Sequence, residues 1–293
     1  MRILYFSQFY RPENMAAAFR ATEHASYWHE WGHDVTVFTG WPNYPTRKLF
    51  PGYEMRLFEE SSADGVRLLR SKQIIGANTS LLRRAINDGS YLAYGIWNGL
   101  TKGKRIGRDY DVVLASSGTI FNGLLGAWYA KRIGVPLVIE FRDLTYKQMV
   151  ATGSPEDGHK VRLIKWLELA LCKGAAAVVV LTDGFERTLA SEGVPTSKME
   201  VIPNGADVVG CGHDWSDRLR LGYFGTMGLS QEVTRNVRYA KVLHDRDLLE
   251  SYELIGEGAA FENVEDIISS EGYDFVSLNH GIPKDQLEAH YAE

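Results

Sequence analysis

The sequence contains little cysteine and no long apolar run. Its 293 residues include two cysteines, Cys172 and Cys211, whose spacing fits no metal-binding motif and whose number does not indicate a disulfide framework. No segment approaches the roughly 18 apolar residues that a transmembrane helix needs, and Met1–Ser7 turns polar too early for a signal peptide. These absences favour a reducing compartment and a cytoplasmic protein, at most peripheral to a membrane.

The sequence also lacks a strong excess of charge of one sign. It has 32 Lys and Arg residues against 37 Asp and Glu residues, a net charge of -5. Both signs are scattered along the chain, so the sequence does not provide the field that general nucleic-acid binding requires. It also shows no cluster of metal ligands. We therefore expect a small or membrane-presented substrate and no nucleic-acid partner.

The chain is long enough, with 45% hydrophobic residues, for two cores. Short apolar runs alternate with stretches of helical period, which predicts an α/β fold of parallel sheets and crossover helices. In a first domain over residues 1–204, the predicted strands are Arg2–Ser7, Asp34–Phe38, Val66–Arg70, Val112–Ala115, Pro136–Phe141, Ala176–Leu181 and Met199–Ile202. The predicted helices are Ala17–Trp31, Leu81–Lys104, Phe121–Ile133, Val161–Cys172 and Phe185–Glu192.

Residues 205–217 show no periodic pattern, which predicts a connector, and the strand–helix alternation resumes over residues 218–293. The elements predicted there are strands Arg218–Phe224, Ser251–Ile255 and Phe275–Asn279 and helices Glu232–Leu243, Phe261–Ser270 and Lys284–Ala292. Three such units are half of a doubly wound domain and would leave the first strand as an apolar sheet edge. We therefore expect the complete domain to continue beyond Glu293.

Two glycine turns follow neighbouring strands of this second domain. They are Gly225-Thr226-Met227-Gly228 and Gly256-Glu257-Gly258. Glycine lets the backbone approach a ligand, and the N-terminus of the following helix attracts phosphate. The turns therefore predict a nucleotide-diphosphate site with donor-binding residues Gly225, Thr226, Met227, Gly228, Gly256 and Gly258. The alternative is a pair of ordinary helix-cap turns.

The loop after the first strand lacks the Gly-x-Gly-x-x-Gly of a dinucleotide dehydrogenase. It offers instead Glu13 and Asn14, which are suited to binding hydroxyls. In the alternative interpretation, Pro12-Glu13 only starts the next helix.

A second polar group, Glu140-Phe141-Arg142-Asp143, ends a buried strand, where parallel sheets present reactive side chains. Arg142 is suited to holding a phosphate or sugar oxygen, and Asp143 to polarising an acceptor hydroxyl. The two residues could equally form a local ion pair that caps the loop. A third segment, Pro203-Asn204-Gly205, follows the last strand of the first domain and indicates a turn.

Further segments follow one another in a specific order. They are Gly32-His33-Asp34-Val35-Thr36-Val37, Thr39-Gly40-Trp41-Pro42-Asn43-Tyr44-Pro45, Glu140-Phe141-Arg142-Asp143-Leu144, Ala176-Ala177-Val178-Val179-Val180-Leu181-Thr182, Val201-Ile202-Pro203-Asn204-Gly205-Ala206-Asp207 and Tyr223-Phe224-Gly225-Thr226-Met227-Gly228. In this order the sequence resembles glycosyltransferase family 4, the retaining GT-B enzymes of bacterial polysaccharide and O-antigen assembly. The resemblance extends over nearly the whole chain.

This resemblance implies two Rossmann-like domains that face each other across a cleft. The first domain would bind a lipid-linked or saccharide acceptor, with Asn43 beside Glu13 and Asn14, and would carry the catalytic residues Arg142 and Asp143. The second would bind a nucleotide-sugar, with UDP as the expected nucleotide. The family usually needs no metal, since helix dipoles and basic side chains offset the phosphate charge.

The sequence departs from the family in two places. Leu229-Ser230-Gln231-Glu232 stands where the family commonly has a basic residue for the diphosphate. The family's paired-glutamate motif would lie beyond Glu293. We therefore expect the chain as it stands to bind donor weakly and to turn over slowly.

A basic and aromatic segment resembles the surfaces by which such enzymes meet lipid-linked acceptors. It contains Arg83, Arg84, Tyr91, Tyr94, Trp97, Lys102, Lys104, Arg105 and Arg108. It predicts peripheral contact with a membrane. The alternative is a solvated helix face.

Two other functions remain open from the sequence. A nucleotide-sugar epimerase shares the two-domain architecture, and it would release a changed sugar still attached to nucleotide without needing an acceptor. A non-catalytic binding module would keep the acceptor domain and lack donor chemistry.

Overall fold

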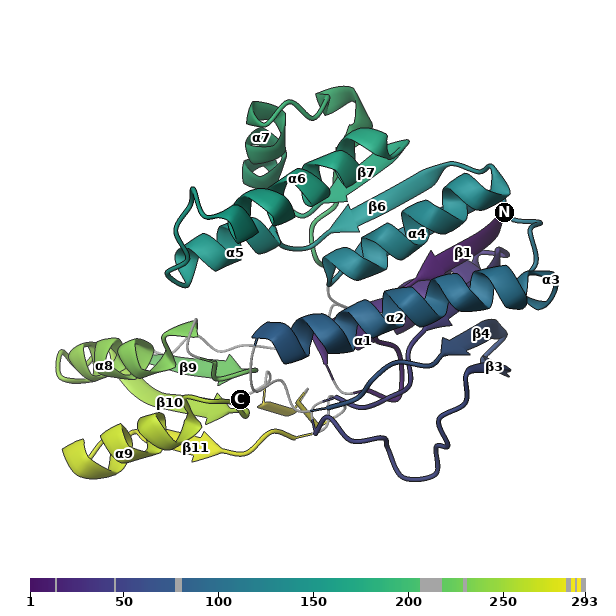
Figure 1. The fold of residues 1–293 in the computed structure, drawn as a ribbon. Helices are drawn as coiled ribbons and strands as arrows, with labels where there is room; N and C mark the ends of the chain where they lie inside the picture. Colours follow the sequence, from purple (N-terminus) through teal and green to yellow (C-terminus); the bar gives the residue numbers. More distant parts are fainter. Residues whose placement is uncertain are drawn as a thin grey trace. The chain divides into compact units, whose positions relative to one another are not determined.

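The computed structural model describes residues 1–13, 15–44, 46–76, 81–205, 218–228, 231–282, 286–287 and 289–290. The chain divides into two compact units, Met1–Asn204 and Gly205–Glu293, which we call unit 1 and unit 2 (Figure 1). The predictions for Asn14, for residues 206–217 and for the helix Lys284–Ala292 fall, wholly or in part, outside the described residues.

Unit 1 is built on an eight-stranded sheet of order β3-β4-β2-β1-β5-β6-β7-β8. Neighbouring strands are parallel except for β3, which runs antiparallel to β4. The strands are β1 (Arg2–Phe6), β2 (Asp34–Thr39), β3 (Phe58–Ala63), β4 (Val66–Ser71), β5 (Val112–Ser117), β6 (Leu137–Phe141), β7 (Ala177–Val180) and β8 (Met199–Val201). The strand order reverses between β1 and β5, which is where open α/β sheets bind ligands.

Helices cover both faces of this sheet (Figure 1). They are α1 (Ala16–Glu30), α2 (Leu81–Thr101), α3 (Gly103–Ile106), α4 (Ile120–Ile133), α5 (Thr145–Ala151), α6 (His159–Gly174) and α7 (Asp183–Ser191). Alternate residues of β1 divide the core: Tyr5 packs with α1 on one face, and Phe6 packs with α2, α4 and α6 on the other. α1 therefore covers its face of β1 while three helices share the opposite face.

The structure adds elements that the sequence pattern did not predict. β3 is a polar edge strand with one buried side chain, Phe58, so it shows no apolar run. α5 has seven residues, too few for a helical period to stand out. The predicted helix Leu81–Lys104 is in fact two helices, because α2 ends at Thr101 and α3 begins at Gly103.

Unit 2 contains a smaller parallel sheet of order β11-β10-β9. Its elements are β9 (Leu219–Phe224), α8 (Val233–His244), β10 (Leu249–Ile255), α9 (Phe261–Glu271) and β11 (Val276–Asn279). Its core gathers side chains of both helices and of the strands, among them Val237, Leu254 and Val264. In the described part of unit 2, β9 pairs with β10 alone.

Candidate functional site

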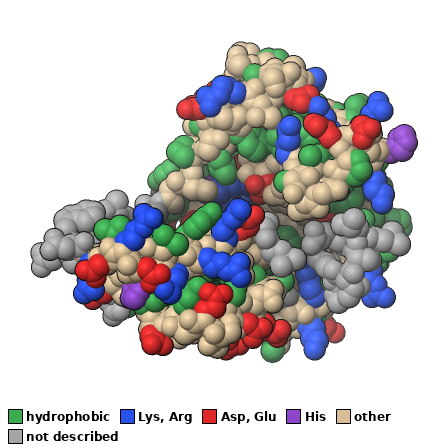
Figure 2. Space-filling view, turned by 90° about the vertical axis from the view of Figure 1, so that its left-hand side faces the viewer, with side chains coloured by type: hydrophobic (Ala, Val, Ile, Leu, Met, Phe, Trp, Pro, Cys, Tyr) green, Lys and Arg blue, Asp and Glu red, His purple; other side chains and the backbone are tan. Residues whose placement is uncertain are grey.

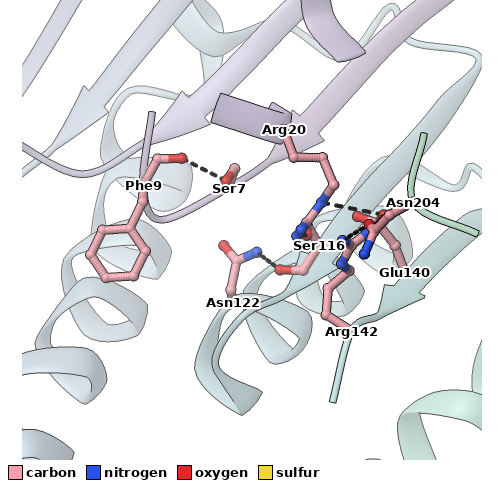
Figure 3. Close-up of polar contacts among 8 residues, drawn as sticks. All are labelled: Ser7, Phe9, Arg20, Ser116, Asn122, Glu140, Arg142 and Asn204. Carbon is pink, nitrogen blue, oxygen red and sulfur yellow. Dashed lines mark hydrogen bonds and ion pairs between the residues drawn. The ribbon is translucent and has the colours of Figure 1, made fainter. Parts of the chain in front are cut away.

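Polar side chains from three strands and a helix meet at the carboxyl edge of the unit 1 sheet (Figure 3). Ser116 lies near the end of β5, Glu140 lies in β6, and Arg142 follows β6 directly. Arg20 reaches them from α1, and Asn204 follows β8. Parallel strands end on the same edge of a sheet, which is why residues so distant in sequence come together.

Glu140 is the centre of this group. Its Oε1 lies 3.0 Å from Nη1 of Arg142 and 3.5 Å from Nε of Arg20. Arg20 also donates from Nη2 to Ser116 Oγ at 3.0 Å, and Arg142 donates from Nη2 to Asn204 Oδ1. The site therefore holds two guanidinium groups around one carboxylate, a net charge of +1.

The surroundings shift the pKa values of both predicted catalytic residues. Burial lowers the pKa of Arg142, and the neighbouring charge of Arg20 lowers it further, although Glu140 opposes the change. Asp143 is exposed at the rim, where desolvation raises its pKa against the opposing charge of Arg142. A raised pKa suits a carboxylate that exchanges a proton with a hydroxyl.

A small pocket lies beside this group, where the strand order reverses. It is lined by Ser7, Gln8, Phe9, Ala17, Ser116, Gly118, Thr119 and Asn122. Asn122 Nδ2 donates to the carbonyl of Ser116 at 2.6 Å (Figure 3) and to that of Phe6 at 2.9 Å, and so joins the ends of β5 and β1. The pocket walls are thus held in place by side-chain bonds to backbone.

The residues predicted to bind acceptor are largely engaged within unit 1. Glu13 is buried, and its carboxylate accepts backbone N–H groups from Asn43 at 2.9 Å, Tyr44 at 3.0 Å and Tyr10 at 3.3 Å. Asn43 is also buried and donates from Nδ2 to Trp41 O at 2.8 Å. These contacts join the loops after β1 and β2, and an acceptor-binding role for Glu13 and Asn43 stays a prediction.

The two glycine turns of unit 2 lie against each other. The N–H of Gly225 donates to Ile255 O at 2.9 Å, the N–H of Met227 to Glu257 O at 2.8 Å, and the N–H of Ala260 to Met227 O at 2.8 Å. The Met227 side chain is fully buried. These N–H groups are already used in holding the turns together. A phosphate would therefore have to contact other atoms of Gly225–Gly228 and Gly256–Gly258.

Several absences concern only the described part of the chain. Within it, no group of three or more His, Cys, Asp or Glu side chains is placed to hold a metal ion. None of its helices combines the length and the apolar composition needed to cross a membrane. On the face shown in Figure 2, basic and acidic side chains of the described residues are interspersed.

Comparison with known proteins identifies the family. A family model described as a glycosyl transferase 4-like domain matches residues 16–205, which include the Glu140–Arg142 group. The chain belongs to the glycosyl transferase 4-like family. No curated protein sequence matches it significantly.

Solved structures share the fold of this glycosyl transferase 4-like chain at low sequence identity. Sucrose-phosphate synthase from Thermosynechococcus elongatus has a TM-score of 0.65 and 13% identity over 99% of this chain and 73% of its own. HepE of Anabaena, in complex with UDP and glucose, has a TM-score of 0.60 and 14% identity over 100% of this chain and 72% of its own. The lipopolysaccharide outer core galactosyltransferase WaaB has a TM-score of 0.51 and 12% identity over 99% of this chain and 71% of its own. The predicted α/β GT-B fold is confirmed.

Sequence reasoning missed three residues that shape the site: Arg20, Asn204 and Glu168. Arg20 was one polar residue among many in α1, and Asn204 was interpreted as part of a turn. Glu168 is buried in α6, and its carboxylate accepts the N–H groups of Thr145 at 2.9 Å and Tyr146 at 3.4 Å. It thereby caps α5, which begins two residues after Asp143. A lone acid within the apolar run Leu167–Leu171 was the available signal.

Replacing Glu168 with alanine is expected to lower the free energy of unfolding by about 3 kcal/mol, because it leaves two buried backbone N–H groups without an acceptor. Glu168→Gln keeps one acceptor and should cost about half as much. Urea unfolding measures both variants. Glu30→Ala, at the exposed end of α1, is the matched control and should change stability by less than about 0.5 kcal/mol.

The same variants test a pH dependence. Burial raises the pKa of Glu168 from its ordinary value of 4.5. The folded chain therefore retains this proton to higher pH than the unfolded chain, and the stability contributed by the group falls as pH rises from 4.5 through the folded pKa. The difference in stability between wild type and Glu168→Gln should shrink over that range. A pH-independent difference would contradict the assignment.

Proposed function

We propose that this chain transfers a sugar, with retention, from a nucleotide-sugar to a lipid-linked or saccharide acceptor in the cytoplasmic assembly of a cell-surface polysaccharide. Its family and fold support this function, as does the UDP-bound state of HepE. The observation that carries the proposal is the pair of guanidinium groups around Glu140, at the sheet edge where α/β proteins bind ligands.

In the proposed reaction, Arg142 supplies positive charge to a phosphate, and Asp143 hydrogen-bonds the attacking acceptor hydroxyl. The glycine turns of unit 2 let the donor diphosphate approach the backbone. The two arginines would provide charge that a divalent cation supplies in other enzymes. We therefore propose that transfer persists in the presence of EDTA.

A panel of nucleotide-sugars, each incubated with and without saccharide and prenyl-phosphate acceptors, tests the function. A glycosyltransferase forms a product in which the sugar has left the nucleotide. A changed sugar still attached to nucleotide, formed without acceptor, would indicate an epimerase instead. If a donor binds but neither product forms, or if no donor binds or reacts, the proposed transfer is contradicted.

We propose that the acceptor is presented at a membrane, and the exposed face of α2 supports peripheral contact.

 Trp97 and Leu100 are 54% and 55% exposed there, Arg83 lies in the first turn of α2, and Lys104 lies in α3, which follows α2. One part of the predicted surface is wrong: Tyr91 is fully buried, and its hydroxyl donates to Phe38 O at 3.1 Å. The aromatic contribution therefore comes chiefly from Trp97.

Replacing Trp97 and Leu100 together with serine is expected to weaken binding to vesicles of phosphatidylglycerol and phosphatidylcholine by about tenfold, since two apolar side chains no longer enter the interface. Vesicle sedimentation measures the partition. Trp31→Ser, which removes a tryptophan 69% exposed at the end of α1, is the control and should leave the partition unchanged. Equal binding by the double variant and wild type would rule out this surface.

A further inference from the structure

The charge cluster of Arg20, Glu140 and Arg142 has an unusual distribution of contacts. Both guanidinium groups approach the same oxygen, Glu140 Oε1, while Oε2 is buried and finds no hydrogen-bond partner among the described residues. The three side chains are only 15%, 7% and 15% exposed, respectively. One carboxylate oxygen therefore serves two cations in a place with little water to offset their charge.

The backbone explains why these groups share one face. Glu140 and Ser116 are register partners on adjacent strands, and Arg142 follows Glu140 at the alternate position, on the same side of the chain. Arg20 and His24 are one helical turn apart on α1, and the His24 ring lies 5.3 Å from that of Trp28, which contacts Tyr5 of β1. Because this face of α1 packs on the sheet, the Arg20 side chain lies at the end of β6.

Hydrogen-bonding capacity also remains in the cluster. A guanidinium has five N–H groups, and the described hydrogen bonds of Arg142 use two of them. Nδ1 of His24 is buried without a hydrogen-bond partner among the described residues, and Nε of Arg20, also buried, has only its 3.5 Å approach to Glu140 Oε1. Guanidinium groups bind phosphate oxygens in a fork geometry, which a lysine cannot reproduce.

We propose that Arg20 and Arg142 together bind a phosphoryl group, with Glu140 as the counter-ion that keeps the two guanidinium groups in place before the ligand arrives. The phosphoryl group belongs either to the diphosphate of a lipid-linked acceptor or to that of the nucleotide donor. Arg20 thus becomes a ligand-binding residue of unit 1. This inference rests on the proposed function for the identity of the phosphate-bearing substrate, but the binding itself needs no sugar transfer.

Titration calorimetry of the full chain with three probes tests the site: inorganic pyrophosphate, geranyl diphosphate and UDP. Arg20→Gln and Arg142→Gln should each weaken pyrophosphate binding by about tenfold to a hundredfold, the usual effect of losing a charged hydrogen bond. Glu140→Gln should tighten it by about threefold to tenfold, because a competing negative charge is gone. A purely structural cluster would not produce these opposite signs. Arg162→Gln, on the exposed side of α6, is the matched control.

The probes distinguish the source of the phosphoryl group. If the arginine variants lose affinity for geranyl diphosphate and pyrophosphate but not for UDP, the site binds the acceptor diphosphate. If they lose affinity for UDP and pyrophosphate but not for geranyl diphosphate, it binds the donor diphosphate. Wild-type affinity for all three probes in both arginine variants, or weaker binding in Glu140→Gln, would overturn the proposal. If Arg20→Gln does not fold, Arg142→Gln at the sheet rim still decides it. If pyrophosphate binds more weakly to the arginine variants and more tightly to Glu140→Gln, but no nucleotide-sugar supports transfer, the phosphoryl site is supported and the proposed function is contradicted.

Discussion

Replacing Arg142 with glutamine is expected to lower kcat for sugar transfer by about 100-fold to 1000-fold, the range seen when a preorganised donor to a developing negative charge is removed. The side chain is held by Glu140 on one side and Asn204 on the other, so it needs little reorganisation to meet a phosphate. The effect should fall on kcat more than on KM, because the leaving phosphate gains charge in the transition state. Steady-state kinetics with the best donor of the panel measures it.

Two further variants sharpen this result. Arg142→Lys keeps the charge but loses the fork, and it should recover only part of the lost turnover. Arg187→Gln, on the exposed face of α7, removes a guanidinium elsewhere in unit 1 and should leave kcat unchanged. Wild-type kcat in Arg142→Gln would show that this residue takes no part in the chemistry.

Replacing Gly256 with alanine is expected to destabilise unit 2 by more than about 3 kcal/mol, in the range of severe overpacking. A Cβ at this position would lie 1.8 Å from the carbonyl oxygen of Gly225, so one of the two turns would have to move. Any movement strains the hydrogen bond from the N–H of Gly225 to Ile255 O. Hydrogen exchange followed over peptides of residues 218–282 measures the local loss of stability.

The matched control lies in the same unit. At Gly281 the nearest atom to an added Cβ, other than its chain neighbours, is Cγ of the Glu257 side chain at 3.4 Å, an ordinary contact with a flexible group. Gly281→Ala should therefore change the exchange of unit 2 by less than about 1 kcal/mol. If Gly256→Ala exchanges like this control, the close approach of the two turns is not needed for stability.

The strands that build the site could be predicted because each is a short apolar run, and their parallel pairing placed Arg142 at the carboxyl edge. The partners of Arg142 could not be predicted in the same way. Arg20 lies 120 residues before Glu140 in the chain, and only the packing of α1 on the sheet brings them together. β3 was missed because an edge strand with one buried residue carries no alternating pattern.

The glycine turns show a different limit. The sequence predicted that Gly256 and Gly258 allow a ligand to approach the backbone, and a binding role remains a prediction. The structure gives a second reason for glycine, since an added Cβ at Gly258 would lie 2.3 Å from Met227 O. A contact between two backbone segments leaves the same sequence pattern as a contact between backbone and phosphate. Sequence alone therefore could not separate the two causes.

The hydrogen bond between Arg142 and Asn204 has a consequence for how unit 1 is connected. Asn204 is the last residue of unit 1, and the chain passes from it directly to Gly205 of unit 2. A change in the backbone torsions that lead from Val201 to Asn204 would move the amide that accepts from Arg142. The junction and the guanidinium are therefore mechanically linked, and the rotamer of Arg142 would respond to the backbone angles at the point where the chain leaves unit 1.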